Sequence, residues 1–202
     1  MKVNGIPTRT IWSIEHGQAV GIIDQTKLPF EFKKERLDDW RQVRDAIATM
    51  KVRGAPLIGI AAVWALVLAI RDNASDDFIH EVRSELIATR PTAVNLQWAV
   101  DHVVKRVISL PQKDRLPAVY KLAKEMTQAD VLTNRAIGTH GARVIAEIYA
   151  RKREPVNILT HCNAGWLATV DYGTALSAVY IAFEQGIPLH VWVDETRPRE
   201  QG

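Results

Sequence analysis

The stretch Val156-Asn157-Ile158-Leu159-Thr160-His161-Cys162 decides the fold expected for this chain. Its apolar and β-branched residues predict a buried β-strand that ends on the only cysteine of the sequence. Asn163-Ala164-Gly165-Trp166 turns out of this strand, the residues from Thr174 to Gln185 predict a helix, and Leu189-His190-Val191-Trp192-Val193 predicts a second strand. A βαβ unit of this kind predicts two parallel strands with a right-handed crossover.

Polar and reactive residues follow both predicted strands. Because parallel strands place their carboxyl ends at the same edge of a sheet, Cys162 and the loop from Asp194 to Gln201 are expected to line one crevice. The alternative for Cys162 is a small buried hydrophobic side chain. His161 is expected to point to the opposite face of the strand. A metal site at His161 and Cys162 is not expected, because zinc usually takes four ligands and the sequence has no second cysteine.

The residues before this unit predict a short β region followed by helices. Two strand-like runs, 10–14 and 19–24, come first. Helical patterns then cover 37–50, 55–70, 76–89, 94–110, 116–127 and 134–153, the last interrupted by Gly138 and Gly141. The predicted protein is α/β. A small, mostly helical N-terminal domain with a short β region (1–120) precedes the start of a doubly wound, Rossmann-like parallel domain (121–202).

The second predicted domain is incomplete. Two parallel strands and one helix cannot cover both faces of a sheet, and parallel sheets are normally covered on both. The last residues, from Asp194 to Gly202, also resemble an active-site loop more than a natural tail. We therefore expect the 202 residues to be a fragment or truncated product of a longer chain.

Composition limits the classes of partner. The 26 basic and 23 acidic residues give a formal charge of +3, spread along the chain, which suits a small anionic substrate and lacks the clustered cations of a nucleic-acid site. A single cysteine and the absence of a signal peptide predict a reducing, cytoplasmic location. The apolar run from Ala55 to Ile70 is shorter than the roughly 20 residues of a membrane span, so a buried helix is expected.

Two further segments have features of anion sites. In Val52-Arg53-Gly54-Ala55-Pro56, the glycine permits close backbone approach, and the free N–H groups of the following helix together with the arginine would bind a phosphate. A plain helix–helix turn with a solvated arginine is the alternative. In Thr89-Arg90-Pro91-Thr92, Arg90 likewise precedes a helix; here the alternative is Thr92 as a helix cap with Arg90 in water. The glycines around His140 indicate close helix packing and a structural role for that histidine.

Five blocks of sequence resemble a known family when they are taken together and in order. They are residues 53–59, 90–96, 160–165, 193–198 and 201–202. This pattern resembles the methylthioribose-1-phosphate isomerases of methionine salvage, which are related to regulatory subunits of the exchange factor for translation initiation factor 2 (2B). The resemblance runs from about Thr10 to Gly202, and the strand-end cysteine with the Asp-Glu-Thr-Arg-Pro block is its most specific part.

The resemblance implies an activity and a set of site residues. The family converts 5-methylthioribose 1-phosphate, a cyclic aldose phosphate, into 5-methylthioribulose 1-phosphate, without a cofactor or metal and as a homodimer. By motif, Cys162 matches the catalytic cysteine. The residues that match substrate-binding positions are Arg53, Gly54, Ala55, Arg90 and Gln201. The family's catalytic aspartate and an Asn-Lys substrate pair lie further along its chain than this sequence extends.

Several alternatives stay open at this point. A related isomerase would act on ribose 1,5-bisphosphate or 5-deoxyribose 1-phosphate. A regulatory subunit would have no activity, although such a subunit has no need of the strand-end thiol of Cys162. A half-enzyme would be inactive whatever its family. Within the isomerase reading, Cys162 either acts as the base of an enediol route or lies as a polarisable neighbour beside a direct hydride shift.

Overall fold

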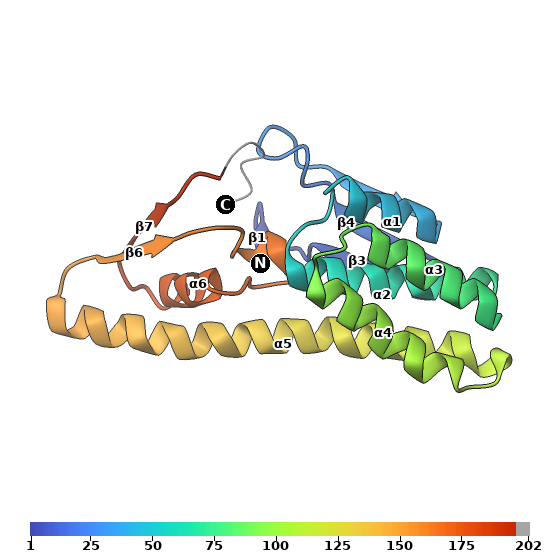
Figure 1. Cartoon of the computed structure of the whole chain (residues 1–202). Helices are drawn as coiled ribbons and strands as arrows, with labels where there is room; N and C mark the ends of the chain where they lie inside the picture. Colours follow the sequence, from blue (N-terminus) through green and yellow to red (C-terminus); the bar gives the residue numbers. More distant parts are fainter. Residues whose placement is uncertain (197–202) are drawn as a thin grey trace. The chain divides into compact units, whose positions relative to one another are not determined.

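The computed structural model describes residues 1–196, and the chain separates into two compact units (Figure 1). One unit is Arg9–Gln128, and the other combines Met1–Thr8 with the chain from Ala129 onward. Helix α5, Gln112–Lys152, runs through the point of division. The domain boundary expected near residue 120 also falls within this helix, and that two-domain assignment stays a prediction.

The unit Arg9–Gln128 contains a three-stranded antiparallel sheet in the order β3-β4-β5. Strands β3 (Ile11–Ile14) and β4 (Ala19–Ile23) correspond to the two predicted strands, and all five residues of β4 are buried. Strand β5 (Lys34–Leu37) was not predicted, because its charged sequence lacks an apolar pattern. It pairs along β4 at the sheet edge, and Glu35 forms ion pairs with Lys33 and Lys51 at 3.1 and 2.7 Å.

Besides the first part of α5, this unit contains, in chain order, α1 (Trp40–Ala48), α2 (Ala55–Asp72), α3 (Asp76–Ala88) and α4 (Val94–Ile108). Helix α2 is long and apolar enough to cross a membrane by length and composition alone. Its side chains from Leu57 to Ile70 are nevertheless buried inside the protein. The prediction of a buried core helix is therefore confirmed.

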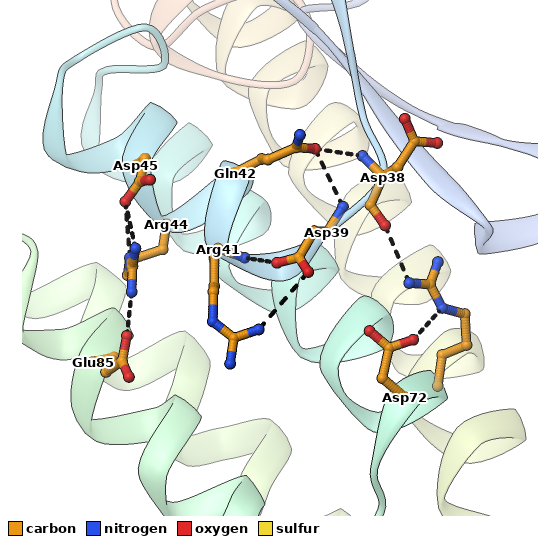
Figure 2. A network of polar contacts seen from close by, with 9 residues as sticks. Asp38, Asp39, Arg41, Gln42, Arg44, Asp45, Asp72 and Glu85 are labelled. Atoms are coloured by element: carbon orange, nitrogen blue, oxygen red, sulfur yellow. Dashed lines mark hydrogen bonds and ion pairs between the residues drawn. The ribbon is translucent and has the colours of Figure 1, made fainter.

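A polar network fixes the start of α1 (Figure 2). The Asp39 side chain accepts a hydrogen bond from the Arg41 backbone N–H at 2.6 Å, and the Gln42 side chain accepts from the backbone N–H groups of Asp38 and Asp39 at 2.7 and 3.2 Å. This reciprocal arrangement is a capping box, which satisfies N–H groups that a helix leaves open at its start. Arg71 of α2 donates to the Asp38 carbonyl at 3.1 Å and so ties α1 to the core helix.

In the other unit, α5 is a single helix where the sequence predicted two. Gly138 and Gly141 do not break it, because they form the surface against which α6 (Leu176–Glu184) packs. A Cβ atom at Gly138 would lie 2.8 Å from the Ser177 carbonyl oxygen, and one at Gly141 would lie 2.5 Å from the Ala178 Cβ. Close helix packing was the expected reason for these glycines, and the structure confirms it.

The predicted βαβ unit is present in this part of the chain. Strands β6 (Val156–Thr160) and β7 (Leu189–Val193) pair in parallel and flank α6. One side of the strands packs on α5 and α6 in a small core of Ala142, Ile145, Val156 and Ala182. Leu159 and Trp192 are 70 and 57% exposed, so β6 is buried on one side only rather than throughout. An antiparallel pair that was not predicted, β1 (Lys2–Val3) and β2 (Ile6–Pro7), also belongs to this unit.

Candidate active site

The carboxyl ends of β6 and β7 are joined by two contacts. The backbone N–H of Asp194, just after β7, donates to the carbonyl of Thr160, the last residue of β6, at 3.1 Å. Beyond that bond, His161 Nδ1 lies 3.2 Å from Asp194 Oδ2. The two strand ends therefore form one edge, as the parallel topology predicts.

Cys162 is exposed at this edge. Its φ of 64° lies in the left-handed region, which non-glycine residues enter at a cost of about 1–2 kcal/mol. The reading of Cys162 as a buried hydrophobic side chain is therefore wrong. Strain of this kind collects at functional sites, where surrounding structure holds a residue in a fixed pose.

The alternation rule used for His161 does not apply here. Strand β6 ends at Thr160, so His161 and Cys162 lie outside the regular strand, and the left-handed turn at Cys162 changes the chain direction. The His161 ring faces the Asp194 carboxylate, which can fix one ring tautomer through Nδ1. Among residues 1–196, no three His, Cys, Asp or Glu side chains are grouped in a way that would hold a metal ion.

The loop that follows Cys162 closes on itself. The Ala164 carbonyl accepts hydrogen bonds from the N–H groups of Thr174 and Leu176 at 3.0 and 3.3 Å. Gly173 has a φ of 80°, and a Cβ atom there would lie 2.4 Å from the Gly165 carbonyl carbon. Only glycine fits this approach, so the two ends of the loop are held together beside the cysteine.

Helix α5 anchors the middle of this loop through Asp130. One carboxylate oxygen accepts from the Val170 N–H at 2.8 Å, and the other accepts from the Asn134 side-chain amide at 3.1 Å. Burial raises the pKa of Asp130, and these hydrogen bonds oppose that shift. Val170 and Thr169 are fully buried, so the anchor fixes the buried part of the loop.

Two side chains near the cysteine were not singled out by sequence reasoning. The Asn163 Nδ2 atom is buried and has no hydrogen-bond acceptor among the described residues. The Tyr180 hydroxyl lies 3.1 Å from the position of a Cβ on Gly165, and burial raises the pKa of this phenol. Both groups are polar, and both belong to the loop or helix beside Cys162. The sequence carried no signal for them beyond their closeness to the motif.

The Arg53 turn has the predicted geometry. Gly54 adopts a φ of 97° as the residue before α2, and Pro56 lies in the first turn of that helix. The Ile58 N–H donates to the Gly54 carbonyl at 3.0 Å. Earlier N–H groups of a helix have no intrahelical acceptor, so the helix start beside Arg53 offers donors for an anion.

The Arg90 turn differs in one detail from expectation. Helix α4 begins after Ala93, which is its N-terminal cap residue, and Thr92 is exposed and does not cap the helix. The Arg90 Nη1 atom is buried and lacks an acceptor within the described part of the chain. A buried guanidinium nitrogen without an acceptor is costly, and a bound anion would satisfy it.

The structure brings some of the predicted site residues together. Asn95 Nδ2 donates to the Ala55 carbonyl at 2.7 Å, which joins the first turns of α4 and α2 and so the segments that follow Arg90 and Arg53. Cys162 belongs to the other unit, together with His161 and Asp194. Gln201 lies outside the described residues.

Comparisons with known proteins agree on one family. A model described as the initiation factor 2 subunit family matches residues 51–202. The chain is 52% identical to the methylthioribose-1-phosphate isomerase of Methylorubrum populi and 51% identical to that of Rhodospirillum centenum, over all of this chain and 55 and 54% of those proteins. It thus spans about half the length of the curated relatives it matches.

Two solved structures with related names are also similar to this chain. The 5-methylthioribose 1-phosphate isomerase of Pyrococcus horikoshii OT3 matches with a TM-score of 0.83 at 37% identity, over 97% of this chain and 55% of that one. The delta subunit of translation initiation factor eIF-2B from A. fulgidus matches with a TM-score of 0.80 at 32% identity, over 97% of this chain and 57% of that one.

Proposed function

Because this chain belongs to the initiation factor 2 subunit family, we propose that it supplies part of an aldose–ketose isomerase that converts 5-methylthioribose 1-phosphate into 5-methylthioribulose 1-phosphate. The observation that carries the proposal is the exposed, left-handed Cys162 at the joined ends of two parallel strands. Relatives about half identical to this chain are named as isomerases of that substrate.

The chemistry requires groups of the kinds found here. The anomeric phosphate blocks the free aldehyde, so the sugar ring opens only after its ring oxygen is protonated. A carboxylic acid suits that step, and the aspartate that the family uses lies beyond this sequence. Hydrogen then moves from C2 to C1, either through an enediol with the Cys162 thiolate as base or as a hydride beside the sulfur atom.

We assign the phosphate to the Arg53 turn. Arg53, with the backbone of Gly54 and Ala55, would form charge-assisted and N–H hydrogen bonds to the phosphate oxygens at the start of α2. Arg90 supplies a guanidinium nitrogen that is buried without an acceptor in the described residues. Gln201 is assigned to the substrate by motif alone.

The remaining parts of the proposal concern partners and location. We propose a cytoplasmic homodimer that needs no cofactor or metal and binds a small sugar phosphate, with neither nucleic acid nor a membrane as partner. The mild, dispersed positive charge suits a small anion.

A regulatory, non-enzymatic subunit is the second candidate, because the A. fulgidus initiation factor subunit is also similar in structure. Two observations favour the isomerase. The isomerase relatives are more similar in sequence, and an exposed thiol at the joined strand ends suits a reaction better than binding alone.

The test is a chimaera that joins these 202 residues to the part of the Methylorubrum populi relative that they do not match. We expect it to isomerise 5-methylthioribose 1-phosphate and to leave ribose 1,5-bisphosphate unchanged. Turnover of the bisphosphate alone would reassign the substrate, and no turnover of either sugar would count against the enzyme. In deuterated water, solvent label at C1 of the product would exclude a pure hydride shift.

A further inference from the structure

We propose that Asn95 is a positioning residue for phosphate binding, which holds the Arg53 and Arg90 turns in one arrangement. The inference rests on the proposed function but concerns a residue to which neither the sequence motifs nor that proposal gives a role. Its basis is the hydrogen bond from Asn95 Nδ2 to the Ala55 carbonyl, at 2.7 Å.

This contact depends on a close approach of α2 and α4. A Cβ atom on Gly59 would lie 3.0 Å from Asn95 Nδ2, 3.3 Å from the Asn95 carbonyl oxygen and 3.3 Å from the Ala99 Cβ. These distances are tighter than most real Cβ contacts, so the glycine makes room for the amide. The first turns of both helices therefore lie against each other at this point.

The hydrogen bond acts on the backbone that would contact phosphate. Ala55 is the first residue of α2, and the N–H groups of this turn are the ones without intrahelical acceptors. Arg53 lies just before Ala55, and Arg90 lies in the turn that leads to Asn95. Fixing the Ala55 carbonyl therefore fixes one turn against the other, together with the distance between the two guanidinium-bearing segments.

An asparagine amide suits this task better than other polar groups. It donates to the carbonyl and adds no charge, whereas an aspartate has no donor when ionised and would repel phosphate. Asn95 itself needs no contact with the ligand. Its removal is expected to loosen the site and to leave the fold intact, because its side chain is only half-buried.

The experiment titrates the 202-residue chain with inorganic phosphate and follows backbone amide shifts by NMR. Asn95→Ala is expected to weaken phosphate binding about three- to tenfold, the range of one net hydrogen bond. Gln97→Ala is the matched control, because Gln97 is an exposed amide on the same helix, and it should bind as wild type. Thermal melts of each variant report on the fold.

A second variant perturbs the contact without removing a polar group. Gly59→Ala places a methyl group against the Asn95 amide and should weaken phosphate binding to a similar extent, with Arg53, Arg90 and Asn95 all present. In the chimaera, both variants should raise KM for the sugar phosphate by more than they lower kcat.

The outcomes separate this inference from the proposed function. Unchanged phosphate affinity in Asn95→Ala, or no phosphate binding by the wild-type chain, would overturn the positioning role. If the chimaera binds phosphate in a way that depends on Asn95 but does not isomerise the sugar, the positioning role is supported. Only the proposed isomerase function is then contradicted.

Discussion

At the scale of single residues, the proposed site depends on charged and polar groups that bind the phosphate of the substrate. Arg53→Ala in the chimaera is expected to raise KM with little change in kcat, because it removes a phosphate contact made in both ground and transition states. A hydrogen bond to a charged group contributes about 1.5–3 kcal/mol, or roughly a 10- to 150-fold rise in KM. Arg106→Ala, an exposed arginine near the other end of α4, is the control in the same kinetic assay. An unchanged KM for Arg53→Ala would remove this residue from the site.

The buried carboxyl group of Asp130 predicts how the melting temperature of the protein depends on pH. Burial raises the pKa of Asp130 in the folded protein above its value in the unfolded chain, so the stabilising effect of its protonated form is present in acid and is lost as pH rises through the folded pKa. Asp130→Asn keeps an acceptor for the Val170 N–H and cannot ionise. It also places an NH2 group opposite the Asn134 amide, which costs the same at every pH. The melting temperature of the variant minus that of wild type should therefore become more positive as the pH rises from 4 to 7.

The control for this prediction is Asp130→Ala, which leaves the buried Val170 N–H without its acceptor and should destabilise the protein at both pH values by about 1–3 kcal/mol. Denaturant unfolding measures the difference. Equal stability of the Asn and Ala variants would contradict the proposed loop anchor.

Sequence reasoning at this scale succeeded where a motif was local and failed where the partner was distant in the chain. The position of Pro56 in the first turn of α2 was predicted from the local order of residues, and the structure confirms it. The Asp194 partner of His161 lies just after a second strand, and the Val170 partner of Asp130 lies in a loop. Neither contact has a signature within one short window of sequence.

At the scale of elements, the glycines of α5 set how closely α6 packs. Gly138→Ala should destabilise the protein by about 1–3 kcal/mol, because the new methyl group would overlap the Ser177 carbonyl and the Ile181 side chain. Thr139→Ala, on an exposed position of the same turn, is the control and should be neutral or stabilising through helix propensity. Denaturant unfolding compares the two. A stabilising Gly138→Ala would mean that α6 does not pack at this glycine.

Helices and strands with a clear apolar pattern were predictable, and those that depend on contacts distant in the sequence were not. The buried helix α2 has a continuous apolar run and was predicted correctly, and so was the parallel pairing of β6 and β7, although β6 is buried on one side only. Two predictions for α5 were wrong: the gap between residues 127 and 134 and the interruption at Gly138 and Gly141. At the two glycines, contact with α6 compensates the low helix propensity. Strand β5 was missed because three of its four residues are charged; its backbone pairing, the ion pairs of Glu35 and the buried Leu37 hold it on the sheet.

At the scale of the whole molecule, the predicted site residues divide between the two compact units. Arg53 and Arg90 belong to the unit Arg9–Gln128, whereas Cys162 belongs to the other unit. The strand–helix–strand pattern predicted the α/β class, and the motifs predicted the family, because they are specific blocks in a fixed order. The roles of Arg53, Arg90 and Cys162 in one reaction are part of the proposed function.

The measurement that tests the central claim most directly compares kcat of the chimaera and its Cys162→Ser variant on 5-methylthioribose 1-phosphate, with iodoacetamide labelling to confirm that the wild-type thiol is accessible. We expect turnover to fall by about 10²–10⁴, the usual range for loss of a group that assists proton transfer, with an unchanged melting temperature. Wild-type turnover in Cys162→Ser would contradict the assignment of the strand-end cysteine to the reaction.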